Sequence, residues 1–397
     1  MGEIMVDYIG TARIRGLVSR IGTGRFIEEL AAEIESDYRR WNEFEKSARH
    51  AIHSPGGVIE LMPTSDGRLY SFKYVNGHPK NTASGLLTVT AFGVLADVAT
   101  GYPVLLSEMT YLTALRTAAT SAVAARLLAR SDSRVMAMIG NGAQSEFQIM
   151  ALHRMTGIRE VRLHDTDPQA TAKLMRNLAS LRIAELKVTR CATTREAVRG
   201  ADIVTTATAD KRNAIILGPQ MIEPGMHLNA VGGDCPGKTE LHADILRRKD
   251  SRIVVEFEPQ ARIEGEIQQL DAASEVAELA AVLLDNRPGR ANSREVTIFD
   301  SVGFALSDFS ALRYLQRLNA EQRTGRQEID LVPMLDDPKD LFGGLTAAAP
   351  LTAAVSATAA SGITSAAGLT LANSSPRVRA ARNAGEPRSS IHEDTVT

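Results

Sequence analysis

The fold is decided by the stretch Arg134-Val-Met-Ala-Met-Ile-Gly140-Asn-Gly142-Ala-Gln-Ser145. An apolar run typical of a β-strand leads into a Gly-x-Gly turn, and a helical pattern begins near Ala143. Gly140 allows a tight turn, Gly142 lets the backbone approach a pyrophosphate, and Ser145 is small enough for the third position of this fingerprint. Because helix N-termini favour phosphate groups, the stretch predicts a dinucleotide site.

Apolar strands alternate with helices from about residue 130 to residue 310, which is typical of a parallel doubly wound sheet. Strands are expected at residues 134–140, 160–165, 202–206, 227–231 and 252–257, and helices near residues 143–155, 168–181 and 194–199. Residues 1–115 instead mix an amphipathic helix around Phe26, Leu30 and Ile34 with β-type runs at 57–62 and 69–75. We therefore expect an α/β protein with a Rossmann-type sheet.

Two carboxylates follow the second expected strand, in His164-Asp165-Thr166-Asp167-Pro168. Asp165 comes 25 residues after Gly140, near the usual place of the carboxylate that binds the adenosine ribose. A carboxylate there would repel a 2′-phosphate, so NAD is favoured over NADP. Thr166-Asp167-Pro168 is also good helix-capping chemistry. We assign Asp165 to the ribose and Asp167 to the cap, with the alternative that either carboxylate only caps the helix.

Two later strands end in polar residues, where ligands of an open α/β sheet lie. Thr205-Thr-Ala-Thr208 could line a nicotinamide–ribose trough, or could simply reflect β-propensity. Asn229-Ala-Val-Gly232-Gly233-Asp234 combines a glycine pair, which admits a flat ring, with a carboxylate suited to general acid/base work. The alternative for Asp234 is a helix cap. Cys235 has no activating base nearby in sequence and is interpreted as a packing residue.

Three cations in the N-terminal part are candidates for binding an anion: Arg49, Lys73 and Arg116. Lys73 lies in the apolar run Tyr70-Ser-Phe-Lys73-Tyr, so it needs an anionic partner unless it alternates onto the solvent face. Arg116 is placed at the start of a helix, where it could also be a surface charge. Residues 117–120 could equally be an anion-binding helix start.

The composition bounds the class of protein. The 397 residues suffice for two domains, and 45 Lys plus Arg against 47 Asp plus Glu give a net charge of −2, which argues against nucleic acid or an anionic membrane as partner. The two cysteines, the lack of a signal peptide and the lack of a transmembrane stretch predict a cytoplasmic protein. The eight histidines show no metal-binding spacing, so no metal is expected.

The C-terminal segment differs from the rest of the chain. Residues 343–376 contain no charged side chain and are dominated by Ala, Ser, Thr and Gly. Such a segment has little apolar surface to offset its ordering entropy, so we expect a disordered tail over 343–397. Its many alanines leave a helix as the alternative, against which the glycines and threonines argue.

Several of these motifs together resemble the ornithine cyclodeaminase/μ-crystallin family, and its bacterial ornithine cyclodeaminase branch most of all. The similarity runs from about Gly16 to Phe342. It is carried by Arg116-Thr-Ala-Ala-Thr120, Gly140-Asn-Gly-Ala-Gln144, Asn229-Ala-Val-Gly-Gly-Asp234, Glu60-Leu-Met-Pro, Phe72-Lys73-Tyr-Val-Asn-Gly-His-Pro, Phe92-Gly-Val-Leu-Ala-Asp and Phe299-Asp-Ser-Val-Gly-Phe-Ala.

The resemblance implies a domain division and a set of site residues. A discontinuous α+β substrate-binding and dimerisation domain would comprise 1–118 and 320–342, with an NAD-binding Rossmann domain over 119–319, in a homodimer. Arg49, Lys73 and Arg116 would hold the substrate carboxylate, with Glu60 nearby and Val302 lining the pocket. NAD would be contacted by Thr88, Thr120, Ala143, Gln144, Asp165, Thr208, Val231, Lys238 and Ser301, together with Gly140, Gly142, Gly232 and Gly233.

The family reaction converts L-ornithine to L-proline and ammonia, with bound NAD as an internal hydride carrier and Asp234 as the catalytic acid/base. No net redox change occurs, so the cofactor can stay bound. Alternatives on the same fold are a lysine cyclodeaminase, an NAD(P)H-dependent imine (ketimine) reductase, an alanine dehydrogenase, and a non-catalytic crystallin-like binding protein. An acid/base at position 234 favours the cyclodeaminase over a binding protein.

Overall fold

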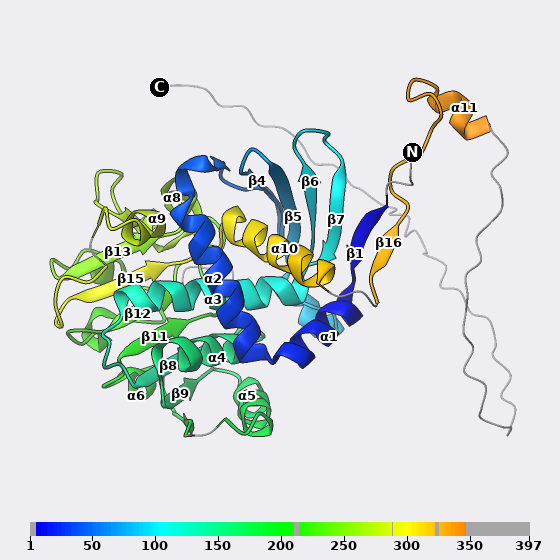
Figure 1. The fold of residues 1–397 in the computed structure, drawn as a ribbon. Coiled ribbons are helices and arrows are strands. Elements are labelled where there is room, and N and C mark those ends of the chain that lie inside the picture. The colour runs from blue at the N-terminus through cyan, green and yellow to red at the C-terminus, as the bar shows by residue number, and fades with distance from the viewer. Residues whose placement is uncertain (1–4, 184, 210–213, 288, 322–324, 347–397) are drawn as a thin grey trace, which may run out of the picture. The chain divides into compact units, whose positions relative to one another are not determined.

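The fingerprint stretch folds as predicted, into strand β8 (Val135–Ile139) and helix α4 (Ser145–Thr156) joined by the glycine turn. The computed structural model describes residues 5–183, 185–209, 214–287, 289–321 and 325–346. Its described strands form two sheets, both within one compact unit (Figure 1).

The sheet that contains β8 is parallel throughout, in the order β10-β9-β8-β11-β12-β15-β13-β14. Strands β9 and β10 are added on one side of β8, and the strands from β11 onward are added on its other side. The direction in which the sheet grows therefore reverses between β8 and β11. This reversal is the topological switch point at which such sheets bind ligands. The strands are β9 (Glu160–His164), β10 (Lys187–Arg190), β11 (Ile203–Thr206), β12 (His227–Ala230), β13 (Ser251–Val255), β14 (Ala277–Glu278) and β15 (Val296–Asp300). The predicted fold class is confirmed.

Short helices connect these strands. They are α5 (Pro168–Ser180), α6 (Thr194–Val198), η3 (Pro219–Met221), α7 (Ala243–Leu246), α8 (Glu258–Glu264), η4 (Glu266–Gln269) and α9 (Leu279–Leu283). The first two match the ranges expected from the sequence. Strands β10, β14 and β15 are additional to those expected from the sequence.

The second sheet is built from the N-terminal part of the chain and one strand from its far end. Its order is β16-β1-β7-β6-β5-β4-β2, with β3 also paired to β4. The strands are β1 (Val6–Ile9), β2 (Glu45–Lys46), β3 (His50–Ser54), β4 (Gly57–Ser65), β5 (Leu69–Gly77), β6 (Val89–Asp97), β7 (Pro103–Glu108) and β16 (Gln327–Ile329). The antiparallel strands β4, β5 and β6 alternate buried and outward-facing side chains, so this sheet has one covered face and one open face.

Helices separate the two sheets. Helix α3 (Thr110–Leu128) runs between them beside α2 (Thr23–Arg39) and α10 (Ala305–Ala320) (Figure 1). The remaining helical segments are α1 (Thr11–Ile21), η1 (Trp41–Glu43), η2 (Pro79–Ser84) and α11 (Leu341–Thr346). Small residues such as Ala118, Ala119 and Ala122 are fully buried on α3, which allows its neighbours to approach closely.

The placement of Arg116 at a helix start is wrong. Helix α3 begins at Thr110, so Arg116 lies in its second turn and residues 117–120 lie further inside it. Backbone N–H groups there are bonded within the helix and cannot bind an anion, which removes that alternative. Arg116 is also buried rather than a surface charge.

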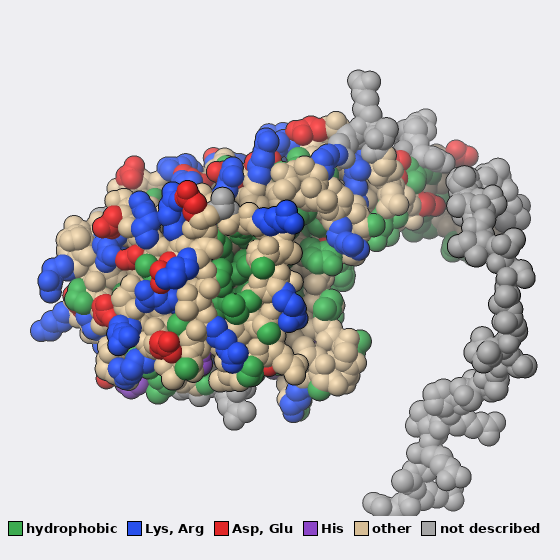
Figure 2. Space-filling view, turned by 90° about the horizontal axis from the view of Figure 1, so that it is seen from below, with side chains coloured by type: hydrophobic (Ala, Val, Ile, Leu, Met, Phe, Trp, Pro, Cys, Tyr) green, Lys and Arg blue, Asp and Glu red, His purple; other side chains and the backbone are tan. Residues whose placement is uncertain are grey.

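Charges are mixed on the surface. Basic and acidic side chains are interspersed over the face drawn in Figure 2, as the near-neutral composition suggests. Within the described part of the chain, no helix combines the length and apolar character needed to cross a membrane. Cys191 and Cys235 are both buried and form no disulfide. The predicted disordered tail covers 343–397; its first residues, 343–346, belong to α11, and the rest lies outside the described residues.

Candidate active site

The glycine turn after β8 has the form that a dinucleotide requires. Gly140 has φ +91°, and a Cβ there would lie 2.5 Å from the Ala207 carbonyl oxygen, so no larger residue fits. Gly142 is exposed, and a Cβ added to it would meet no atom of the chain within 4 Å. Space is therefore open in front of the turn, at the N-terminus of α4, where a pyrophosphate would be stabilised.

The two carboxylates after β9 have separate roles. Asp167 accepts a hydrogen bond from the Gln169 N–H (2.8 Å) at the start of α5, which confirms its predicted capping role. Asp165 accepts from the backbone N–H groups of Asn141 (2.5 Å) and Asp167 (2.8 Å). Asp165 thus lies against the glycine turn, at the carboxyl edge of the sheet.

Asp234 follows β12 at the same edge. Residues 235–242 after it form no helix, so the interpretation of Asp234 as a helix cap is wrong. Its side chain is 43% exposed, with one oxygen 3.3 Å from the Lys238 ammonium. That ammonium also donates to the Thr208 carbonyl (3.0 Å), which links the loops after β11 and β12. Asp234 is therefore held in place but accessible to a ligand.

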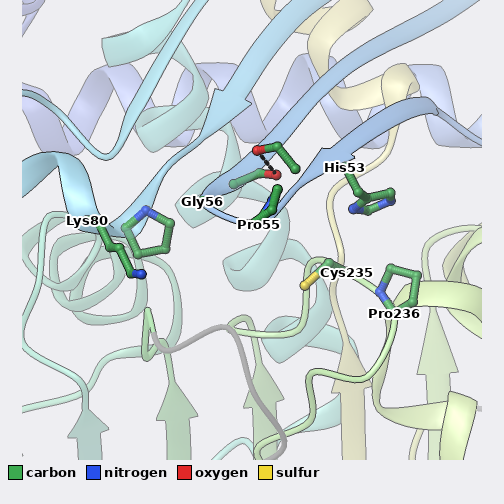
Figure 3. A pocket seen from close by; sticks show the side chains of 9 residues that line it. His53, Pro55, Gly56, Lys80, Cys235 and Pro236 are labelled. Atoms are coloured by element: carbon green, nitrogen blue, oxygen red, sulfur yellow. Dashed lines mark hydrogen bonds between the residues drawn. The ribbon is translucent and has the colours of Figure 1, made fainter. Parts of the chain in front are cut away.

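A cavity of about 540 Å³ opens against Cys235 and Pro236, the two residues that follow Asp234 in the sequence (Figure 3). Figure 3 shows the parallel strands pointing toward it from one side, with Cys235 and Pro236 at its floor, and the β3–β4 turn and η2 on the other side. Its lining residues are His53, Ser54, Pro55, Gly56, Gly57, Pro79, Lys80, Cys235 and Pro236. The cavity therefore lies between the β3–β4 turn and the loop after β12, and none of the predicted catalytic, substrate-binding or cofactor-binding residues lines it.

Two of the predicted cations share one buried carboxylate. Asp308, on α10, is 2.8 Å from the Lys73 ammonium and 3.0 Å from the Arg116 Nε. The three side chains are each at most 6% exposed. The interpretation that Lys73 faces solvent is therefore wrong, and its anionic partner within the chain is Asp308. Arg116 Nη1 is buried and makes no hydrogen bond to the described residues, so it can still receive an acceptor.

Arg49 is the third buried cation. Its guanidinium lies 3.0 Å from a Glu60 oxygen and 3.0 Å from a Glu264 oxygen. It also donates to the carbonyl oxygens of Val302 (2.5 Å) and Gly303 (2.7 Å), in the loop after β15. Arg49 thus connects the N-terminal sheet with the carboxyl edge of the parallel sheet.

Burial and neighbouring charges shift the pKa values of this cluster in opposite directions. Burial, helped by the Arg116 guanidinium, lowers the pKa of Lys73 to about 8, although Asp308 opposes the shift. Burial also acts to lower the pKa of Arg49, but Glu60, Glu264 and Asp234 outweigh it and the net shift is upward.

The remaining predicted residues come from several elements: Thr120 lies on α3, Gln144 directly precedes α4, and Thr88 directly precedes β6 of the N-terminal sheet. Thr120 is buried, and its hydroxyl donates to the Arg116 carbonyl (2.9 Å). Gln144 donates to the Ala114 carbonyl (3.0 Å), and Ala143 beside it is exposed. The other positions have these contacts: Val231 N–H donates to the Thr206 carbonyl, Thr88 accepts at its carbonyl from the His78 N–H, Ser301 donates to Glu256, and Gly233 is buried.

Buried carboxylates around the site were missed by the sequence analysis, among them Glu240, Glu256, Glu264 and Asp308. Glu256 accepts from the Gly303 N–H (2.6 Å), and burial raises its pKa despite the nearby Arg116. An acidic residue among apolar ones, as in Phe304-Ala-Leu-Ser-Asp308-Phe, is a signal that could have identified Asp308. Among the described residues, no group of three His, Cys, Asp or Glu side chains could hold a metal ion.

Comparison with known proteins identifies the family. The model of the ornithine cyclodeaminase/mu-crystallin family matches residues 14–323. The ornithine cyclodeaminase of Brucella suis is 58% identical over 342 residues, covering 86% of this chain and 94% of that protein. A solved lysine cyclodeaminase is 28% identical with a TM-score of 0.80, covering 85% of this chain and 99% of that one. An archaeal alanine dehydrogenase dimer with bound NAD is 29% identical with a TM-score of 0.74, covering 83% and 100%.

The matched range includes the cation cluster, the glycine turn and Asp234, and the family expected from the motifs is confirmed. The chain belongs to the ornithine cyclodeaminase/mu-crystallin family.

Proposed function

We propose that this protein is an NAD-dependent ornithine cyclodeaminase that converts L-ornithine to L-proline and ammonia. One observation carries the proposal: an accessible carboxylate, Asp234, follows β12 at the carboxyl edge of the parallel sheet, and the buried cation Arg49 contacts the loop after the neighbouring strand β15 at that edge. The buried cations can bind the carboxylate of an amino acid, and Asp234 can exchange protons with its amines. The 58% identity to a named ornithine cyclodeaminase supports the same activity.

The parallel sheet would hold NAD, and the residues present fit it. The open space before Gly142 suits the pyrophosphate, and Asp165 at the end of β9 suits the adenosine ribose. Thr208, Val231 and Lys238 lie in the loops after β11 and β12, and the other cofactor residues are assigned by family resemblance. When bound, NAD supplies the reversible removal of a hydride from the substrate Cα.

The chain's own residues bind the substrate and move its protons. Arg116, through its Nη1, together with Lys73 and Arg49, would bind the substrate carboxylate. Glu60 would lie near the substrate, and Val302 would line the pocket. Asp234 would accept a proton from one substrate amine and return it as ammonia leaves, while the bond from Cα to the departing nitrogen is replaced by one to the side-chain nitrogen.

Other chemistries on this fold have different signatures. The solved lysine cyclodeaminase recognises L-lysine, L-ornithine and L-2,4-diaminobutyric acid, so diamino acids of other lengths are the main competing substrates. A reductase would consume NAD(P)H stoichiometrically, a dehydrogenase would accumulate NADH, and a crystallin-like binding protein would do neither.

The decisive experiment incubates the purified protein with NAD⁺ and each diamino acid, and then identifies the cyclic product and measures ammonia. We expect L-proline and ammonia from ornithine in equal amounts, with no lasting change at the NADH absorbance band. Pipecolate formed faster from lysine would establish a lysine cyclodeaminase, and a lasting absorbance change would contradict internal recycling of the cofactor.

The pKa of Lys73 leads to a pH prediction. The ammonium is charged below pH 8 and loses its proton as pH rises through about 8, so the KM for ornithine should rise in that range. Lys73→Arg places a group there that stays charged, and its KM should change less between about pH 7.5 and about pH 9.5. The substrate's amines titrate equally for both proteins, so the difference isolates Lys73. Parallel KM profiles would contradict its binding role.

We further propose that the N-terminal sheet, with residues 1–118 and 320–342, is the substrate-binding and dimerisation domain, and that 119–319 form the NAD domain. The open face of β4, β5 and β6 is apolar: Ile59, Leu61, Tyr70 and Phe92 are between 39% and 44% exposed. Phe92 also stacks on Tyr74 (5.1 Å between ring centroids). A contiguous apolar surface of this kind is typical of a protein interface, which supports a homodimer. Two cysteines without a disulfide suit the cytoplasm.

Phe92→Lys should disrupt that homodimer, because it places a charge on the apolar face and removes the ring that stacks on Tyr74. Sedimentation velocity should show a dimer for the unaltered protein and a monomer-containing mixture for the variant. Leu181→Lys is the matched control, since Leu181 is 44% exposed but lies after α5. An unaltered protein that sediments as a monomer at micromolar concentration would exclude the dimer.

A further inference from the structure

A buried carboxylate bridges the two loops that follow β11 and β12. Glu240 is 1% exposed. One of its oxygens accepts from the Thr208 N–H (2.7 Å) and the Thr208 hydroxyl (2.5 Å), and the other accepts from the Gly232 N–H (3.0 Å). Hydrogen bonds to an ionised acceptor are stronger than neutral ones, so Glu240 fastens both loops.

Glu240 makes these hydrogen bonds just beyond the point where the backbone hydrogen bonds between β11 and β12 end. The ladder between the two strands pairs Thr206 with Ala230, and its last bond runs from the Val231 N–H to the Thr206 carbonyl. Beyond that bond the chains diverge, and Glu240 supplies the acceptors that a neighbouring strand would have supplied. Glu240 therefore holds the first residues of both loops together, in addition to the Lys238 ammonium that bonds Thr208 and Asp234.

The backbone of Glu240 is held in place by hydrogen bonds of its own. Its backbone N–H and that of Leu241 donate to the two oxygens of Glu266, at 2.7 and 3.0 Å. Its carbonyl accepts from the N–H groups of Ile216 (2.7 Å) and Leu217 (3.1 Å). The carboxylate therefore extends from a backbone that has little freedom to move aside.

This contact explains why position 232 is glycine. The three atoms nearest a Cβ added at Gly232 all belong to the Glu240 carboxyl group, at 2.2 to 2.3 Å. Gly232 does not have a positive φ, so its backbone conformation does not itself need glycine. The sequence analysis attributed the glycine pair to a flat cofactor ring, whereas at Gly232 the close neighbour in this structure is a carboxylate.

We propose that Glu240 is a positioning residue for the nicotinamide end of the cofactor site, and that Gly232 is glycine in order to admit its carboxylate. The inference rests on the proposed NAD site, because it acts through Thr208 and Gly232, which are assigned to that cofactor.

A mutant cycle on NADH affinity, followed by the fluorescence of bound NADH, tests the proposal. Glu240→Ala and Gly232→Ala should each weaken NADH binding about tenfold or more, the effect of losing a charged hydrogen bond. In the double variant the effects should not multiply, because the methyl group added at position 232 then enters the space that the carboxylate left. If Gly232 is needed by the cofactor ring itself, Gly232→Ala will weaken binding equally in both backgrounds, and the proposal is overturned.

Glu223, an exposed glutamate at the opposite edge of the sheet, offers a control of the same residue type. Its carboxylate accepts from the Gly200 N–H (2.9 Å), before β11 begins. Glu223→Gln should leave NADH affinity unchanged, whereas Glu240→Gln, which keeps the size of the side chain, should weaken it. The comparison of Glu240→Gln with Glu223→Gln tests the proposal even if Glu240→Ala does not fold. Equal NADH affinities for these two variants would overturn the proposal. Failure of the unaltered protein to bind NADH would overturn the proposed function as well, whereas binding with independent effects in the cycle would overturn this inference alone.

Discussion

Asp234→Ala should lower kcat for ornithine by about 10²–10⁴-fold, the usual contribution of a general acid/base group, while NADH still binds. The carboxylate is accessible at the edge of the parallel sheet and has one ionic contact among the described residues, to Lys238. Its removal should therefore affect proton transfer far more than folding. Ammonia release and NADH fluorescence, measured on the same preparation, separate the two effects.

Two further variants sharpen this test. Asp234→Asn keeps the shape of the side chain but cannot accept a proton at neutral pH, so it should be nearly as inactive as Asp234→Ala. Asp244→Asn removes a more exposed carboxylate, 62% accessible on α7, and should leave turnover unchanged. Ammonia release by Asp234→Asn at the normal rate would eliminate Asp234 as the acid/base.

Asp308→Ala should have the largest effect on folding stability. Asp308 is 1% exposed and forms ion pairs with both Lys73 and Arg116. Breaking a buried ion pair by removing one partner typically costs about 3–5 kcal/mol, because it leaves an uncompensated buried charge. The free energy of unfolding, obtained from urea titration, should fall by an amount of this order.

Asp308→Asn separates charge from packing. The amide keeps the volume but not the charge, so Lys73, whose pKa is already about 8, should lose its proton more readily. The KM for ornithine at about pH 7.5 should therefore rise more than kcat falls. Asp132→Asn breaks an ion pair whose Asp side chain is 79% exposed, and should change stability by less than about 1 kcal/mol. Equal effects of Asp308→Asn and Asp132→Asn would show that the buried cluster has no special role.

The sequence predicted the position of the carboxylates at the edge of the parallel sheet better than the position of the buried cation Arg116. Asp165, Asp167 and Asp234 each follow an apolar run directly, and strands of a parallel sheet bring such positions to one edge. Their place at that edge could therefore be predicted from neighbouring residues alone. Arg116 was placed at the wrong point of its helix because α3 carries small and apolar residues on all sides, which hides the helix start in the pattern.

The charge partners could not be predicted, because they come from distant parts of the chain. Lys73, on β5, meets Asp308, on α10, only because that helix packs against the sheet. Whether a lysine in an apolar strand faces solvent or core depends on what covers that face of the sheet, and period-two alternation fits both arrangements.

The sequence by itself determined the parallel sheet, its glycine turn and the carboxylates that end its strands, since strand periodicity and turn chemistry depend on adjacent residues. Only the tertiary structure decided that Lys73 and Arg116 share Asp308, and that Gly232 makes room for Glu240. The physical reason is that buried charges must find partners wherever packing brings them, and packing joins residues whose separation along the chain carries no local pattern.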